Sequence, residues 1–182
     1  MGNDKSRKFN KIVYLTLALL LVAVAILAFL NRGDAELRRA LEENREFHIR
    51  INGEHAATIG LQALLDMYPQ EFTTSFATSV APARDTVLRG VEMRLLFEAA
   101  GIDISQASHF IVSGLDSYYS PLTRAEVEKE DVIYICYMMD GKLLEPQSKG
   151  GFGPFLMVIR GERFAQRWCK YVEAVDVILT ND

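Results

Sequence analysis

The stretch KGGFGPFLMVIRGERFAQRWCKY, residues 149–171, joins a glycine-rich loop to an apolar run and then to a basic cluster. The loop lacks the Gly-Lys-Ser/Thr ending that places a lysine on the phosphates of a nucleotide in a P-loop. FLMVIR is typical of a strand, so the loop is not followed by a helix N-terminus that would favour an anion. The glycines are therefore predicted to let a long loop bend into a strand.

Four basic residues cluster in the second half of this stretch: Arg160, Arg163, Arg167 and Lys170. Arg167 and Lys170 flank Trp168, and a guanidinium and an ammonium group beside an aromatic ring suit an anionic, planar ligand. The same residues also suit a solvated strand end, and charge alone favours that simpler interpretation.

Strands are predicted around this stretch wherever apolar residues alternate, or run on, between turn residues. They cover residues 47–51, 71–80, 109–114, 131–139, 155–160 and 171–179. Helical periodicity predicts helices over residues 61–68 and 91–102, and a third short helix within residues 122–131. Helices interspersed among strands that are mostly joined by hairpins predict an α+β fold with a mixed sheet.

Local motifs mark the ends of several of these elements. Asn52-Gly53 and Asp140-Gly141 supply pairs of residues that accept positive φ, as two-residue hairpin turns require. Gly101 is placed to cap the C-terminus of a helix. Thr123 and Glu126 have the spacing of a capping box, which predicts a helix start.

Residues 12–30 are nineteen consecutive residues without a charge, so a helix of this length approaches the thickness of a bilayer core. A cleaved signal peptide is the alternative, but its apolar stretch is usually shorter and the sequence offers a poor cleavage site. We therefore expect a basic cytoplasmic tail (1–11), a transmembrane helix (12–30), a helical stalk (31–46) and one domain (47–182).

The orientation in the membrane rests on the length of the two flanks. Lys and Arg residues are equally numerous just before and just after the apolar segment. The short basic tail is expected inside, because a long domain is translocated largely regardless of its charge. The sequence thus predicts an extracytoplasmic C-terminal domain, with the membrane as one partner and a protein as a second.

The overall charge excludes one class of partner. The 182 residues carry 20 Lys and Arg against 24 Asp and Glu, a net charge of −4. A nucleic-acid binder needs enough basic residues on one face to neutralise several phosphates, so nucleic acid is set aside. The Gly-x-Ser-x-Gly elbow of a hydrolase is also absent from the sequence.

Cysteines and histidines are few. Cys136 and Cys169 could form one disulfide outside the cytoplasm, or stay two buried apolar thiols that never meet, and the sequence leaves both open. The histidines are His48, His55 and His109. His48 and His55 could face each other across the hairpin, but a metal site needs further ligands, so none is predicted.

Four motifs in this order carry a resemblance to a known family. GPFLMVIRG followed by RWCK resembles the end of the sulfite oxidase-like molybdopterin-binding domain, where Gly-x-Pro-x-Arg, three apolar residues and Pro-Gly precede a basic residue and Lys-Trp. LRGVEMRLLFEAAGI, GLDSYYSPLTRAEV and DVIYICYMMDGKLL resemble earlier parts of the domain. The resemblance covers residues 47–178 and implies the family's α+β fold and an association with redox chemistry.

This chain departs from the family where the resemblance implies metal and anion ligands. The usual cysteine falls on Thr78 or Ser79, the usual histidine near Gly151 and the usual arginine on Leu156. A hydroxyl replaces a soft thiolate poorly as a metal ligand. No metal ligand is therefore predicted, and whether the chain is an enzyme stays open.

The resemblance leaves a small set of candidate cofactor-binding residues: Arg167, Lys170, Asp116, Tyr118 and Gly153. Asp116 and Tyr118 lie in GLDSYYSP, which is either a ligand-facing loop or, more commonly, a turn built by Asp and Ser. Molybdopterin is the cofactor that this set would hold.

Two functions remain open. In the first, the domain binds a molybdopterin-type cofactor or another anionic ligand and takes part in electron transfer. In the second, the fold has lost its cofactor and acts as a binding or assembly module beside a membrane partner. A concave pocket at residues 150–153 lined by Arg167 and Lys170 would favour ligand binding, and a filled apolar surface would favour the module.

Overall fold

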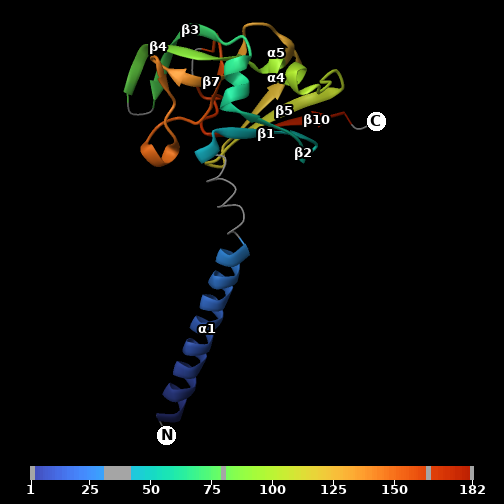
Figure 1. The fold of residues 1–182 in the computed structure, drawn as a ribbon. Helices are drawn as coiled ribbons and strands as arrows, with labels where there is room; N and C mark the ends of the chain where they lie inside the picture. Colours follow the sequence, from blue (N-terminus) through green and yellow to red (C-terminus); the bar gives the residue numbers. More distant parts are fainter. Residues whose placement is uncertain (1–2, 31–41, 79–80, 163–164, 181–182) are drawn as a thin grey trace. The chain divides into compact units, whose positions relative to one another are not determined.

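The computed structural model describes residues 3–30, 42–78, 81–162 and 165–180. They belong to two compact units, Met1–Arg39 and Ala40–Asp182. The first unit is represented by one helix, α1 (Asn3–Leu30), drawn in blue in Figure 1. Its large apolar side chains are exposed, among them Tyr14 and Leu21.

Over the residues described, no helix is both long and apolar enough to cross a membrane. The transmembrane part of the fold prediction is therefore not confirmed and stays a prediction. Most of the predicted stalk, residues 31–41, lies outside the described residues, and residues 42–44 are helical.

The second unit contains two five-stranded sheets, shown in Figure 1. The first sheet has the order β2-β1-β10-β5-β6. Its strands are β1 (Glu46–Ile51), β2 (Glu54–Gly60), β5 (Ala107–Gly114), β6 (Tyr119–Thr123) and β10 (Val172–Leu179). Strands β1 and β10 are parallel and the other pairs are antiparallel, so this sheet is mixed.

The second sheet is antiparallel throughout. Its path is β3-β4-β7-β8, and β9 also pairs with β7. The strands are β3 (Gln70–Thr78), β4 (Ala81–Glu92), β7 (Ile133–Met139), β8 (Lys142–Leu143) and β9 (Leu156–Ile159). The predicted α+β class with a mixed sheet is confirmed, and the strands divide between this antiparallel sheet and the mixed one.

Three short helices and one 3-10 turn connect these strands. They are α3 (Leu61–Asp66), α4 (Met93–Ala100), α5 (Arg124–Glu128) and η1 (Gln147–Lys149). The predicted helices over 61–68 and 91–102 are present but shorter than predicted, and the short helix predicted within 122–131 is α5. Four strands had no predicted range: β2 and β8, which follow the two predicted hairpin turns, and β4 and β6, which no predicted turn implies.

The predicted turns are confirmed by their backbone angles. Asn52 and Gly53 have φ of 51° and 83°, and Asp140 and Gly141 have φ of 50° and 74°. Gly101 caps α4 in the left-handed conformation. The capping box of Thr123 and Glu126 is formed in both directions at the start of α5.

One hydrophobic cluster joins the two sheets. Phe47 of β1 meets Phe155, which precedes β9, with ring centroids 5.1 Å apart. Cys169 pairs with Met157 of β9 through backbone hydrogen bonds in both directions. Cys136 and Cys169 are both buried and free, so no disulfide links them in this structure.

Candidate functional site

The predicted cofactor-binding residues gather around the segment that links β9 to β10. Asp116 Oδ1 accepts a hydrogen bond from the backbone N–H of Tyr118 at 3.2 Å. The Tyr118 hydroxyl donates to the carbonyl of Gln166 at 2.5 Å. Lys170 Nζ lies 4.5 Å from the centre of the Phe152 ring, next to Gly153. Residues far apart in the sequence are thus brought onto one segment, residues 166–171.

Arg167 is already occupied by two carboxylates. Its Nε donates to Glu162 Oε1 at 2.7 Å, and its Nη2 donates to Glu126 Oε1 at 2.8 Å and also to Glu162. The hydrogen bond from Arg167 lowers the pKa of Glu126 to about 2. The same bond raises the pKa of Arg167. Two negative charges face one positive charge, so an anion binding here would first have to displace a glutamate.

The thiol of Cys169, beside these residues, is protonated and is therefore a poor metal ligand. Burial, together with the charge of Asp116, raises the pKa of Cys169 to about 12. Burial alone raises the pKa of Cys136 strongly. Only a thiolate is a good metal ligand, and both thiols stay protonated near neutral pH. Arg163 of the predicted basic cluster lies outside the described residues.

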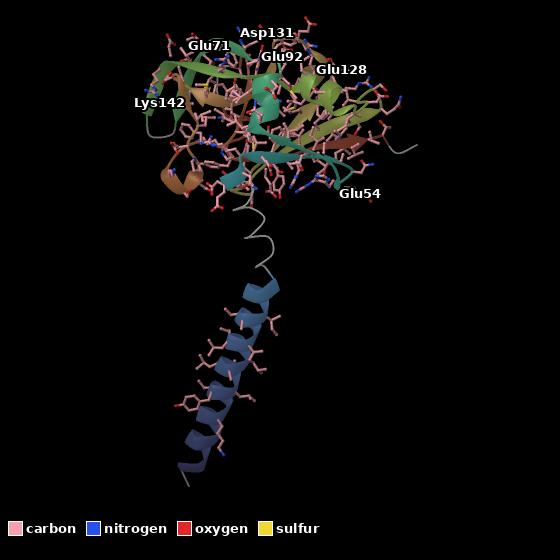
Figure 2. All side chains as sticks on the ribbon, in the orientation of Figure 1. Glu54, Glu71, Glu92, Glu128, Asp131 and Lys142 are labelled. Atoms are coloured by element: carbon pink, nitrogen blue, oxygen red, sulfur yellow. The ribbon has the colours of Figure 1, made fainter. Side chains whose placement is uncertain are left out.

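A hollow of about 340 Å³ lies beside the glycine loop. Its lining residues come from the first part of β4, the β7–β8 hairpin, the segment that follows β8 and the glycine loop: Arg84, Met139, Asp140, Lys142, Leu143, Leu144, Glu145, Gly151 and Phe152. Figure 2 labels Lys142, which is exposed at this edge of the second sheet. The hollow combines an apolar wall with a rim of charged groups.

The charged groups at the rim are held by their neighbours. Arg84 Nη2 lies 3.2 Å from Asp140 Oδ2, while the other carboxylate oxygen of Asp140 accepts the backbone N–H of Val87 at 3.0 Å. Lys149 Nζ lies 3.5 Å from Glu145 Oε2. The lining holds two basic and two acidic residues, and Lys142 is the basic residue that lies outside these two pairs.

The glycine loop packs closely on the backbone of residues 144–145, and Gly151 lines the hollow. A Cβ atom on Gly151 would lie 2.0 Å from the carbonyl oxygen of Glu145, and one on Gly153 would lie 2.6 Å from that of Leu144. The N–H of Gly153 donates to the Glu145 carbonyl at 2.8 Å. Gly150 adopts φ of 76°, which bends the loop. The structural role predicted for these glycines is confirmed.

A pocket at the glycine loop lined by Arg167 and Lys170 would have favoured ligand binding, and this hollow meets only the first of these two conditions. It lies at the glycine loop, but its basic residues are Arg84 and Lys142 instead of Arg167 and Lys170. Sequence reasoning missed both of these residues. The one signal for Lys142 was the predicted Asp-Gly turn that it follows, and Arg84 lies on a strand that was not predicted.

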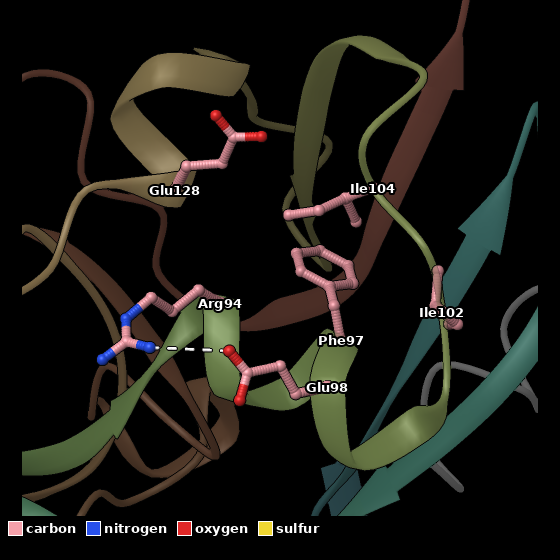
Figure 3. Close-up of a pocket in the computed structure, with 6 residues that line it drawn as sticks. All are labelled: Arg94, Phe97, Glu98, Ile102, Ile104 and Glu128. Atoms are coloured by element: carbon pink, nitrogen blue, oxygen red, sulfur yellow. Dashed lines mark hydrogen bonds and ion pairs between the residues drawn. The ribbon is translucent and has the colours of Figure 1, made fainter.

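A second hollow, of about 260 Å³, lies between α4, α5 and the loop that follows α4 (Figure 3). Figure 3 shows Phe97 beside Ile104, with Glu98 directed at Arg94. Arg94 contacts Glu92 at 2.7 Å and Glu98 at 3.5 Å. Because its guanidinium is shared among carboxylates, this hollow offers no unpaired cation to an anionic ligand.

These features define an α+β domain of the sulfite oxidase-like class, in which the glycine loop borders the candidate site. The chain belongs to the family described as the oxidoreductase molybdopterin binding domain, whose model matches residues 37–181. The resemblance drawn from the sequence is therefore confirmed. No curated protein matches the chain significantly.

A solved structure supports the fold independently. The crystal structure of the sulfane dehydrogenase SoxCD from Paracoccus pantotrophus matches with a TM-score of 0.57 and 14% sequence identity. The match covers 73% of this chain and 38% of that chain. At this identity the likeness concerns the fold alone, and this chain spans well under half of the SoxCD chain.

The residues present do not fit a molybdenum centre. Gly151, near which the resemblance puts the family's histidine, has no room for a side chain, because a Cβ there would lie 2.0 Å from the Glu145 carbonyl oxygen. Leu156, at the arginine position, is fully buried in β9. Thr78 ends β3 without a thiol, and Ser79 lies outside the described residues. Among the described residues, no group of three or more His, Cys, Asp or Glu side chains is placed to hold a metal ion.

Proposed function

We propose that this chain is a membrane-anchored binding module that keeps the molybdopterin-binding-domain fold without its metal chemistry. The observation that carries the proposal is the contact of Gly151 with Glu145, which leaves no room for an imidazole beside the hollow. The hollow beside the glycine loop is bordered by the apolar side chains of Leu143 and Phe152 and by the ammonium group of Lys142. A group that is partly apolar and carries a negative charge suits this lining.

The test is metal and pterin analysis of the full chain. The protein would be purified in detergent from a host that makes the molybdopterin cofactor. We expect a folded protein with neither molybdenum nor pterin fluorescence above background. Near-stoichiometric molybdenum or pterin would overturn the proposal, because it would show that other residues replace the missing ligands.

The anchor is proposed from the sequence and from the surface of α1. Residues 12–30 carry no charge, and large apolar side chains such as Leu21 and Leu27 are exposed on the helix. Exposed apolar surface of this kind is stable in lipid and costly in water. We place the basic tail, residues 1–11, inside and the domain outside the cytoplasm. Protease treatment of intact cells tests this orientation, and a fully protected domain would contradict it.

A second candidate function is the binding of a molybdopterin-type cofactor in a redox context. Membership of the family favours it, as does the gathering of Asp116, Tyr118, Lys170 and Arg167 around one segment. Binding of an anionic cofactor by Arg167 requires this residue to break its ion pairs with Glu126 and Glu162. The cofactor-free binding module is therefore the better-supported function. The same metal and pterin analysis distinguishes the two.

A further inference from the structure

The β1–β2 hairpin directs two histidines at one hydroxyl group. His48 Nδ1 lies 3.1 Å from Thr58 Oγ1, and His55 Nε2 lies 2.9 Å from the same oxygen. The two imidazole rings are 5.0 Å apart between centroids and meet edge to face at 79°. A nitrogen from each ring is therefore directed at the Thr58 hydroxyl oxygen, which brings three possible donor atoms close together.

The strands fix this arrangement through their register. His48 lies directly opposite Thr58, and a bulge at Ile49/Arg50 brings His55 opposite Arg50. Phe47 and Ile49, on either side of His48 in the chain, are fully buried. Since successive side chains of a strand point to opposite faces, the core contacts of β1 hold His48 on the outer face. The histidines thus sit on a rigid element, which favours a preformed site.

The chemistry of the three groups suits a divalent transition metal. A neutral imidazole offers one nitrogen lone pair, and a hydroxyl oxygen is a further weak donor atom. Partial burial, and then the neighbouring His55 and Arg50, lower the pKa of His48, which favours the neutral form that binds metals. The carboxylates of Glu46 and Glu173 are close enough to act on His48 and attract a cation, although Arg50 is also near.

We propose that His48 Nδ1 and His55 Nε2, beside Thr58 Oγ1, form a surface site for a divalent transition-metal ion, completed by water. Two imidazoles without a third strong protein ligand make an open and exchangeable site instead of a closed structural one. Imidazole binds copper(II) more tightly than nickel(II) or zinc(II) in sites of this kind. The site lies on the mixed sheet, away from the hollow in the other sheet, and does not depend on the proposed function.

The test is a copper(II) titration of the untagged, metal-free full chain in detergent, followed by calorimetry and electron paramagnetic resonance. We expect one strong equivalent with nitrogen coordination in the spectrum. His48→Gln and His55→Gln should each weaken binding by at least about tenfold, since even the loss of a group that only supports a ligand costs about that much. Both side chains lie at the surface of a hairpin, so these variants should stay folded, which circular dichroism would verify.

His109→Gln is the matched control. His109 lies on β5 in the same sheet, and its Nδ1 shares a hydrogen bond with Ser108 instead of with Thr58. Its replacement should leave the copper affinity unchanged. The proposal fails if the parent chain binds no copper with nitrogen coordination, or if the His48 and His55 variants bind as tightly as the parent. Equal losses in all three variants would also overturn it, because they would show non-specific binding.

Discussion

Gly151 illustrates how one missing side chain shapes the candidate site. Its backbone packs so closely on Glu145 that an added Cβ would lie 2.0 Å from a carbonyl oxygen. We predict that Gly151→Ala destabilises the domain by about 1–3 kcal/mol, the usual cost of forcing an extra methyl group into a packed region. Urea unfolding measures this loss.

Gly60→Ala is the control for that experiment. A Cβ on Gly60 would meet the Cγ of Glu46 at 3.6 Å, an ordinary contact, and Gly60 has φ of −98°, which any residue adopts. This variant should change the free energy of unfolding little. If both variants lost the same free energy of unfolding, the close contact with Glu145 would not be the reason for glycine at position 151.

The bond between Glu126 and Arg167 predicts a pH dependence with a definite sign. Folding lowers the pKa of Glu126 from 4.5 to about 2. Its contribution to stability is therefore fully present above about pH 4.5 and is lost as the pH falls through about 2. Glu126→Gln removes the charge but retains a residue that suits the capping box. The parent should exceed this variant in stability near neutral pH, and the difference should shrink in acid.

Urea unfolding at successive pH values measures that difference. Glu128→Gln serves as the control, because Glu128 lies 3.5 Å from Arg124 with both side chains largely exposed, and such pairs contribute little. A Glu126→Gln difference that stays constant down to strongly acidic pH would contradict the assigned ion pair.

At the scale of elements, the sequence predicted those strands whose pattern is local. The apolar run of β7 and the Asn-Gly hairpin of β1 and β2 are examples. Strand β4 was missed because it contains Pro82 and Gly90, which usually interrupt strands. Gly90 is required by tertiary contact, since a Cβ there would lie 2.4 Å from the Ile135 carbonyl oxygen of β7. Strand β6 was missed because it holds Pro121, which is tolerated at the edge of a sheet.

The candidate site was less predictable than the fold because its decisive contacts join distant residues. The pairing of Arg84 with Asp140, and of Arg167 with Glu126, links elements whose proximity no local pattern reveals. The sequence correctly identified the glycine loop and the lack of a P-loop ending. It also placed His48 and His55 across one hairpin, where the structure has them. It did not reveal that Arg167 is already neutralised.

The β1–β2 hairpin allows a prediction at the scale of one element. Gly53 has φ of 83° with nothing within 4 Å of an added Cβ, so its only constraint is backbone conformation. Gly53→Ala should therefore cost about 1 kcal/mol, the usual penalty for a left-handed residue with a side chain. Thermal unfolding measures the cost. A variant as stable as the parent would show that the turn does not depend on the positive φ of Gly53.

At the scale of the whole molecule, the folded core and the apolar helix belong to separate units. All the residues of the hydrophobic core cluster lie within Ala40–Asp182. Burial of apolar surface is the main source of stability, so that unit contains what it needs to fold by itself. Large apolar side chains of α1, among them Leu21 and Leu27, are exposed. The two units are therefore expected to have separate roles, anchoring and binding.

This separation predicts that the second unit keeps its fold when the N-terminal unit is removed. A chain that begins at Ala40 should be soluble and should unfold at the same temperature as the domain in the full chain, because no core residue is removed.

The full chain should stay in the membrane fraction after alkaline carbonate extraction, which releases proteins held only at the surface. Fractionation and thermal unfolding check the two halves of the prediction. Release of the full chain by carbonate would contradict the anchor and leave the fold untouched, whereas an unfolded fragment would show that the N-terminal unit stabilises the domain.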